Sequence, residues 1–332
     1  MRKIILMFFA ITFIIGLTYF FNIKKEPVEK DEDVSLMVAV ENENVTKEYE
    51  CGDVDLNSID TAAEDLKKRL AESAISNVEP NASLINFDKL YDFDYLCQNF
   101  YQIDNTTTTN SAQLNYDKLM SFEMAIDETV EGPNILIYHT HSQEGYKDSV
   151  PGDASTTVVG VGEYLKKLLE QEGFRVLHHT GEYDVGNRNR AYSKAAPDIQ
   201  KILSDNPSIQ VVIDLHRDGI PESTHLATEI EGRPTAKVMF FNGLCKTTSQ
   251  GNLTNLANPY LDSDLALSFQ LQLQAAQKYP DLTRKIYLKG YRYNMHMCPK
   301  SILVEVGAQN NTVEEAMNAM IPLEDVLSDV LR

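Results

Sequence analysis

Residues 135–146 read ILIYHTHSQEGY, a short apolar run that ends in two histidines and a glutamate. A brief, bounded run of branched aliphatic residues is typical of a buried strand, so we expect a strand at 135–137. His139, His141 and Glu144 follow its carboxyl end, the edge of an open α/β sheet where ligands bind. Imidazole nitrogens and a carboxylate are donors that zinc prefers, so this stretch predicts a metal site. The two histidines share a face if the chain stays extended.

A second run, IQVVIDL at residues 209–215, delivers His216 at its end. Together with the donors of the first stretch, it gives three ligands from two strand ends and leaves a coordination position for water. Zinc would lower the pKa of that water enough to form hydroxide near neutral pH. Arg217 and Asp218 come next and are candidates to orient His216 or to hold substrate. Solvated charges at the edge of the sheet are the alternative interpretation.

The third run, SILVEVG at residues 301–307, carries Glu305 in its interior. A carboxylate in an apolar strand costs on the order of several kcal/mol unless it is paired or hydrogen-bonded. One explanation is a buried ion pair with Arg217 or Arg292. The other is a catalytic base that takes a proton from the attacking water and passes it to the leaving amine.

Two further residues are candidates to support the metal ligands or to contact substrate: His139 and Asn294. For an isolated H-x-H pair, the alternative is two loop histidines bonded to the backbone. The nearby Glu144 and the second strand end with His216 favour the metal site.

The composition fits a globular protein. The chain has 332 residues, of which 43% are hydrophobic, enough for a sizeable core. Its net charge of −19 argues against nucleic acid as a partner, because phosphates would be repelled. Helical spacing at 156–172 and 262–278 alternates with the strand runs. We therefore expect an α/β fold with a mostly parallel or mixed sheet and helices on both faces.

The amino-terminal part predicts a membrane protein. Residues 1–25 hold a nearly unbroken apolar run flanked by basic residues, long enough to span a bilayer as an uncleaved anchor. A cleaved signal peptide is the alternative. Residues 26–83 form an acidic linker with a possible helix, 84–131 an extension packed on the catalytic domain, and 132–332 that domain. The predicted topology is single-pass, with a cytoplasmic amino terminus and an extracytoplasmic catalytic domain.

Four segments in order resemble the stage II sporulation protein P family of membrane-anchored cell-wall hydrolases. They are LYDFDYLCQNFY, ILIYHTHSQEGY, VVIDLHRDG and ILVEVGAQNNTVEEA, and the resemblance runs from about Leu84 to the carboxyl terminus. The last segment is similar to the glutamate-bearing strand of zinc N-acetylmuramoyl-L-alanine amidases, and the resemblance implies an amidase-like α/β fold.

By position, the resemblance implies that His141 and His216 bind one Zn²⁺ ion and that Glu305 is catalytic. Those amidases take a further glutamate ligand from the start of the first helix, where this sequence has no carboxylate. Glu144 is the substitute, with Glu163 or Asp153 as alternatives.

The implied activity is cleavage of the N-acetylmuramoyl-L-alanine amide of peptidoglycan, with cleavage of stem-peptide cross-links as a further option. The implied setting is septal wall remodelling during sporulation engulfment, with stage II sporulation proteins D and M as partners. Two alternatives stay open: a zinc peptidase that acts only on stem peptides, and a non-catalytic scaffold that binds peptidoglycan.

Overall fold

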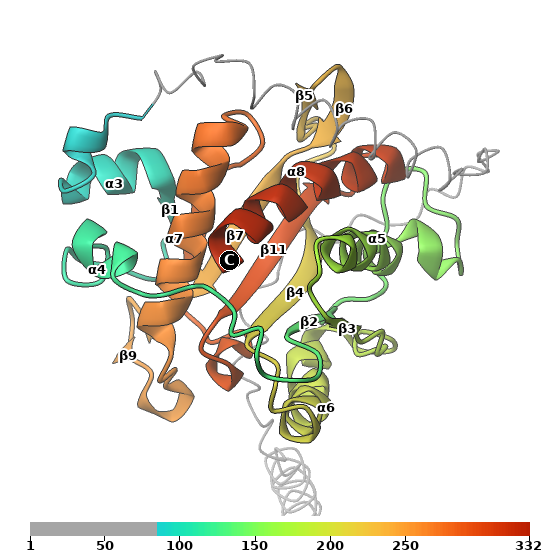
Figure 1. The fold of residues 1–332 in the computed structure, drawn as a ribbon, viewed down its shortest axis with the longest axis horizontal. Helices are drawn as coiled ribbons and strands as arrows, with labels where there is room; N and C mark the ends of the chain where they lie inside the picture. The colour runs from blue at the N-terminus through green and yellow to red at the C-terminus, as the bar shows by residue number, and fades with distance from the viewer. Residues whose placement is uncertain (1–84) are drawn as a thin grey trace, which may run out of the picture. The chain divides into compact units, whose positions relative to one another are not determined.

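The computed structural model describes residues 85–332, so the predicted anchor (1–25) and acidic linker (26–83) lie outside the described residues. A seven-stranded sheet with the order β1-β10-β7-β11-β4-β2-β3 forms its centre (Figure 1). Its strands in chain order are β1 (Tyr101–Ile103), β2 (Ile135–Tyr138), β3 (Val176–His178), β4 (Val211–Asp218), β7 (Val238–Gly243), β10 (Ile286–Lys289) and β11 (Ser301–Ala308).

The sheet is mixed. Strands β3, β2, β4 and β11 run parallel to one another, β11 pairs with β7 in the antiparallel sense, and β10 and β1 then run parallel to β7. The three apolar runs of the sequence become the neighbouring strands β2, β4 and β11. Since these three are parallel, their carboxyl ends lie at the same edge of the sheet, which is where the candidate residues follow.

Helices cover both faces of this sheet, and the α/β prediction is confirmed. On β2, Ile135 and Ile137 join one buried cluster with residues of α5 and α8, whereas Leu136 and Tyr138 join a second cluster with residues of α6. Figure 1 shows α5, α7 and α8 on the near face. The α-helices are α3 (Phe93–Phe100), α4 (Tyr116–Met120), α5 (Val158–Gln171), α6 (Ala191–Asp205), α7 (Leu261–Lys278) and α8 (Val313–Leu331).

Shorter elements decorate the edges of the fold. Two small antiparallel pairs, β5 with β6 and β8 with β9, stand apart from the main sheet. Their bounds are β5 (Ala227–Ile230), β6 (Arg233–Ala236), β8 (Lys246–Thr247) and β9 (Gly251–Asn252), and the 3₁₀-helices are η3 (Phe87–Lys89), η4 (Ala154–Thr156), η5 (Arg188–Arg190), η6 (Thr254–Leu256) and η7 (Met295–Met297). Within residues 85–332, none of the helices combines the length and the apolar character needed to cross a membrane.

Residues 85–131 are tied closely to the rest of the domain. Strand β1 from this segment pairs with β10 at the edge of the main sheet. The rings of Phe100 and Tyr101 contact Phe269 of α7, with centroid distances of 5.5 and 6.4 Å. The backbone N–H of Ile126 donates to the carbonyl of Leu331 at 2.8 Å. The segment therefore contributes one strand of the sheet itself.

Candidate metal centre

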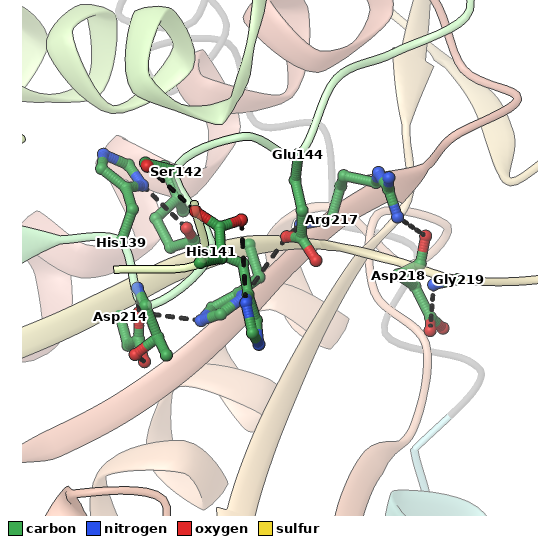
Figure 2. Close-up of polar contacts among 12 residues, drawn as sticks. His139, His141, Ser142, Glu144, Asp214, Arg217, Asp218 and Gly219 are labelled. Atoms are coloured by element: carbon green, nitrogen blue, oxygen red, sulfur yellow. Dashed lines mark hydrogen bonds and ion pairs between the residues drawn. The ribbon is translucent and has the colours of Figure 1, made fainter. Parts of the chain in front are cut away.

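The ends of β2 and β4 bring two histidines together. His141 lies in the turn after β2 and His216 lies in β4, and both are buried. Their ring centroids are 5.3 Å apart with an interplanar angle of 74°. Figure 2 shows His141 close to Glu144 and Asp214. Two imidazoles 75 positions apart in the chain thus share one site because their strands are parallel neighbours.

Glu144 completes a group of three. The backbone N–H of Glu144 donates to the carbonyl of His141 at 3.1 Å, and this turn brings the carboxylate back over the histidines. Its Oε2 lies 3.3 Å from Nδ1 of His216 and accepts the backbone N–H of Arg217 at 3.0 Å. Its Oε1 accepts a hydrogen bond from the guanidinium of Arg188 at 2.5 Å. Burial raises the pKa of Glu144, but His216 and Arg217 outweigh burial and hold it well below the usual value.

The kind of donor, and the spacing of one pair of donor atoms, fit zinc. Tetrahedral Zn²⁺ with bonds of about 2.0–2.1 Å holds neighbouring ligand atoms roughly 3.3 Å apart, and Glu144 Oε2 and His216 Nδ1 are 3.3 Å apart. Both ring nitrogens of His141 are enclosed and have no hydrogen-bond partner. Buried polar atoms rarely lack partners, and free imidazole nitrogens are what a metal ligand must offer.

The three donors are not yet at the mutual spacing of a formed site. Among residues 85–332, no set of three His, Cys, Asp or Glu side chains meets that spacing. Glu144 and His216 are paired with each other, while His141 makes no hydrogen bond through either ring nitrogen. Burial and the neighbouring His216 lower the pKa of His141 to about 3, so it is neutral at pH 7 and its nitrogens can accept a metal.

Glu305 of β11 stands directly beside His216. The two residues are partners in the parallel register of β11 and β4, so their side chains leave the same face of the sheet. The Oε2 atom of Glu305 is enclosed and has no partner. Oε2 forms no ion pair with Arg217 or Arg292 in the described part of the chain, but the charge of Arg217 still acts on Glu305 and lowers its pKa. Burial raises its pKa to about 8; His216 opposes that rise, and Asp218 and Glu144 add to it.

This raised pKa predicts a pH-dependent stability of the metal-free protein. Glu305 has a pKa of about 8 in the folded protein, against an ordinary value of 4.5. It therefore holds its proton more tightly in the folded state. Its contribution to stability is complete below the unfolded pKa and is lost as the pH rises through the folded pKa. The advantage of Glu305→Gln over wild type in unfolding free energy should grow by about 2–4 kcal/mol from pH 5 to pH 8. Denaturant titrations at the two pH values measure it, and a constant difference would contradict it.

The remaining candidates have different positions. Arg217 holds the Glu144 turn, because its Nε also donates to the carbonyl of Gly145 at 2.9 Å. Asp218 points away to an ion pair of 2.6 Å with Arg284. Asn294 donates from its side chain to the backbone carbonyl of Tyr192 at 3.0 Å. The ring of Tyr192 stands edge-on to that of His141 at 5.8 Å, so Asn294 reaches the histidines only through Tyr192.

His139 lies outside the group of three. The expectation that it shares a face with His141 is wrong, because a turn begins at Thr140. Nδ1 of His139 donates to the carbonyl of Leu215 at 2.8 Å, and its Nε2 lies 2.8 Å from Nε2 of His178. His178 in turn bonds to Glu163 at 2.9 Å. Glu163, one alternative third ligand, is therefore engaged with His178. The other, Asp153, is exposed and caps η4.

Helix α5 makes room for the His139–His178 pair at Gly162. A Cβ atom at this position would stand 2.7 Å from Cε1 of His139 and 3.0 Å from Nε2 of His178. Alanine normally stabilises a helix interior by up to about 1 kcal/mol over glycine. Here we expect the opposite sign: Gly162→Ala should lower the unfolding free energy by about 1–3 kcal/mol, as overpacking does. Chemical denaturation measures this, and a gain in stability would contradict the packing described.

Sequence reasoning missed three charged residues around the site. Asp214 sits in β4 two residues before His216, and its Oδ1 lies 2.8 Å from Nε2 of His216, a short contact without the alignment of a linear hydrogen bond. Asp184 is buried, and its Oδ2 lies 3.8 Å from Nδ1 of His141. The side chain of Arg188, which is 45% exposed, forms ion pairs with both Glu144 and Asp184. Asp214 could have been found in the sequence by the pattern that singles out Glu305, a carboxylate inside an apolar strand. No such pattern marks Asp184 or Arg188.

Comparison with known sequences decides the family. The stage II sporulation protein P (SpoIIP) family matches residues 18–328 of the chain. The protein belongs to the SpoIIP family. A curated relative, stage II sporulation protein P of Bacillus subtilis (strain 168), is 26% identical over 215 residues, which cover 59% of this chain and 50% of the relative. The chain thus matches about half the length of that SpoIIP protein.

Solved structures that are similar to this SpoIIP chain include amidases and the catalytic domain of an endolysin. The CwlD amidase of Clostridioides difficile, solved with the GerS lipoprotein, is 14% identical, with 59% of this chain and 95% of that chain covered and a TM-score of 0.37. The catalytic domain of the CD27L endolysin, which targets Clostridia difficile, is 11% identical, with 60% and 99% covered and a TM-score of 0.38. The amidase Ami1 of Mycobacterium smegmatis is 12% identical, with 62% and 95% covered and a TM-score of 0.35.

Proposed function

We propose that this protein is a zinc-dependent hydrolase of peptidoglycan that cleaves the N-acetylmuramoyl-L-alanine amide bond. The observation that carries the proposal is the arrangement of His141, His216 and Glu305: two buried imidazoles in contact, with a carboxylate beside one of them in register, one oxygen of which is enclosed and has no partner. A protein that only binds glycan has no need for such a set. Membership of the SpoIIP family supports a role in the cell wall.

Each of the side chains at this site would have its own role. His141, His216 and Glu144 would hold the zinc ion, which when bound supplies Lewis acidity and lowers the pKa of water. Glu305 would take a proton from the attacking water and deliver it to the nitrogen of the leaving L-alanine. A pKa raised to about 8 lets it exist in both protonation states near neutral pH, as a proton carrier must. The partly exposed guanidinium of Arg188, which pairs with Glu144, would face the negative charge that develops on the amide oxygen.

Product analysis tests the bond that is cut. Purified muropeptides incubated with the protein and zinc should release intact stem peptides with a new amine on L-alanine. New amines inside the stem peptide or the cross-link alone would show a zinc peptidase instead. Binding to sacculi without any soluble product, unchanged by Glu305→Gln, would show a scaffold.

The setting is part of the proposal as well. We propose that residues 1–25 anchor the chain in the cell membrane with residues 132–332 outside the cytoplasm, and that stage II sporulation proteins D and M are its partners during engulfment. Protease added to intact protoplasts should remove the catalytic domain, whereas full protection would contradict this topology. Co-purification of the partners from sporulating cells tests the second part.

A further inference from the structure

The side chain of Asp214 joins the two strand ends that carry the histidines. It lies in β4 and is buried. Its Oδ1 accepts the backbone N–H of Thr140 at 2.9 Å, and its Oδ2 accepts the hydroxyl of Thr140 at 2.6 Å. The same Oδ1 lies 2.8 Å from Nε2 of His216. One carboxylate therefore holds both the residue before His141 and the ring of His216.

These contacts account for the position of His141. Along β2 the side chains alternate, and His139 continues the side of Ile135 and Ile137 toward α5. If the strand went on, His141 would lie on that side too. The turn that begins at Thr140 instead places His141 beside His216. The two hydrogen bonds from Thr140 to Asp214 hold this turn against β4.

The ring of His216 lies between two carboxylates. Its Nε2 is 2.8 Å from Oδ1 of Asp214, without a hydrogen bond, and its Nδ1 is 3.3 Å from Oε2 of Glu144. Asp214 therefore packs against the ring of His216 and at the same time holds the turn that carries His141.

We propose that Asp214 is the positioning residue of the metal centre: it holds the Thr140 turn that carries His141 and packs against the ring of His216, so that both imidazoles face one ion. This inference rests on the proposed function, because it concerns the same zinc ion. It adds the residue that brings the two histidines together.

Zinc affinity, measured by competition with a chromophoric chelator, tests this without any measurement of activity. Asp214→Asn should weaken zinc binding by about 10–100-fold, the range for carboxylates that orient a ligand. Thr140→Val, which removes only the hydroxyl bond, should weaken it less than Asp214→Asn does. Asp325→Asn is the control for the lost charge, because Asp325 lies in α8 and pairs with Lys278 at 2.6 Å; its affinity should equal that of wild type.

A second measurement separates positioning from a general loss of structure. In metal-free protein labelled with ¹⁵N-histidine, NMR should show displaced ring signals of His141 in Asp214→Asn, because the amide nitrogen of Asn cannot accept the hydroxyl of Thr140. Thermal unfolding of this variant should stay cooperative.

The outcomes are distinct. If wild type binds zinc and Asp214→Asn binds it equally well, the positioning role of Asp214 is wrong and the proposed function stands. If wild type binds no zinc, the proposed function is wrong and the role of Asp214 falls with it. If Asp214→Asn does not fold, an unchanged affinity of Thr140→Val together with unchanged ring signals of His141 in that variant would overturn the inference.

Discussion

Replacing Glu305 with Gln is expected to lower the rate of muropeptide cleavage by about a thousandfold while zinc still binds. General acid–base catalysis by one side chain is worth roughly 10²–10⁴ in rate. Gln has nearly the same shape but cannot carry the proton from water to the leaving amine. Because the Oε2 atom of Glu305 has no hydrogen-bond partner, the substitution should leave the proposed ligands His141, His216 and Glu144 in place. Release of stem peptides from purified muropeptides, followed by chromatography, measures the rate.

The matched control for this variant is Glu170→Gln. Glu170 lies on the exposed face of α5, so the same change of charge there should leave the rate within a factor of about two of wild type. A Glu305→Gln protein that cleaves at the wild-type rate would show that the buried carboxylate is structural.

Replacing either histidine with Ala is expected to remove both zinc and activity. Each imidazole is one of only three donors, and structural or catalytic zinc is held by three or four. His141→Ala and His216→Ala should each lower zinc affinity by on the order of a thousandfold or more, so that dialysed protein contains little metal. Metal analysis by mass spectrometry measures the content. His225→Ala is the control, since His225 is paired with Glu315 away from the site.

The third ligand is tested in the same series. Glu144→Ala should lose zinc too, because its Oε2 faces Nδ1 of His216. Should Glu144→Ala keep its metal, the next candidate is Asp184, whose Oδ2 lies 3.8 Å from Nδ1 of His141. Loss of zinc in Asp184→Ala together with retention in Glu144→Ala would then reassign the ligand.

The strand ends were predictable from the sequence because their signals are local. Buried parallel strands are continuous apolar runs, and 135–137, 209–215 and 301–307 are runs of this kind. Parallel neighbours end at one edge, so residues that follow two such runs meet. The spacing of His141, His216 and Glu305 along the chain gives no hint of this contact, but the fold class does.

The sides on which His139 and His141 lie were not predictable in the same way. Period-two alternation holds only while the chain stays extended, and the turn at Thr140 is held by Asp214, which is 74 residues away. A hydrogen bond between residues so far apart in the chain cannot be predicted from a short stretch of sequence. The positions of Asp184 and Arg188 cannot be predicted from the sequence either, because the approach of their loop to Glu144 depends on tertiary packing.

Residues 85–131 show a further limit. The segment LYDFDYLCQNFYQID alternates apolar and polar residues, as a strand does, but the structure divides it into helix α3 and strand β1. Asp92 caps α3 by accepting the backbone N–H groups of Asp94 and Tyr95. β1 has three residues and gains its place only by pairing with β10, far along the chain. Such a short edge strand has too few residues for a pattern.

The most direct test of the metal centre is a crystal structure of zinc-soaked protein, with anomalous scattering recorded on both sides of the zinc absorption edge. We expect one zinc ion bound by His141, by Nδ1 of His216 and by Glu144, with the carboxylate of Glu305 facing it. An ion bound elsewhere, or an anomalous map without a peak between His141 and His216, would contradict the enzymatic function proposed for this protein.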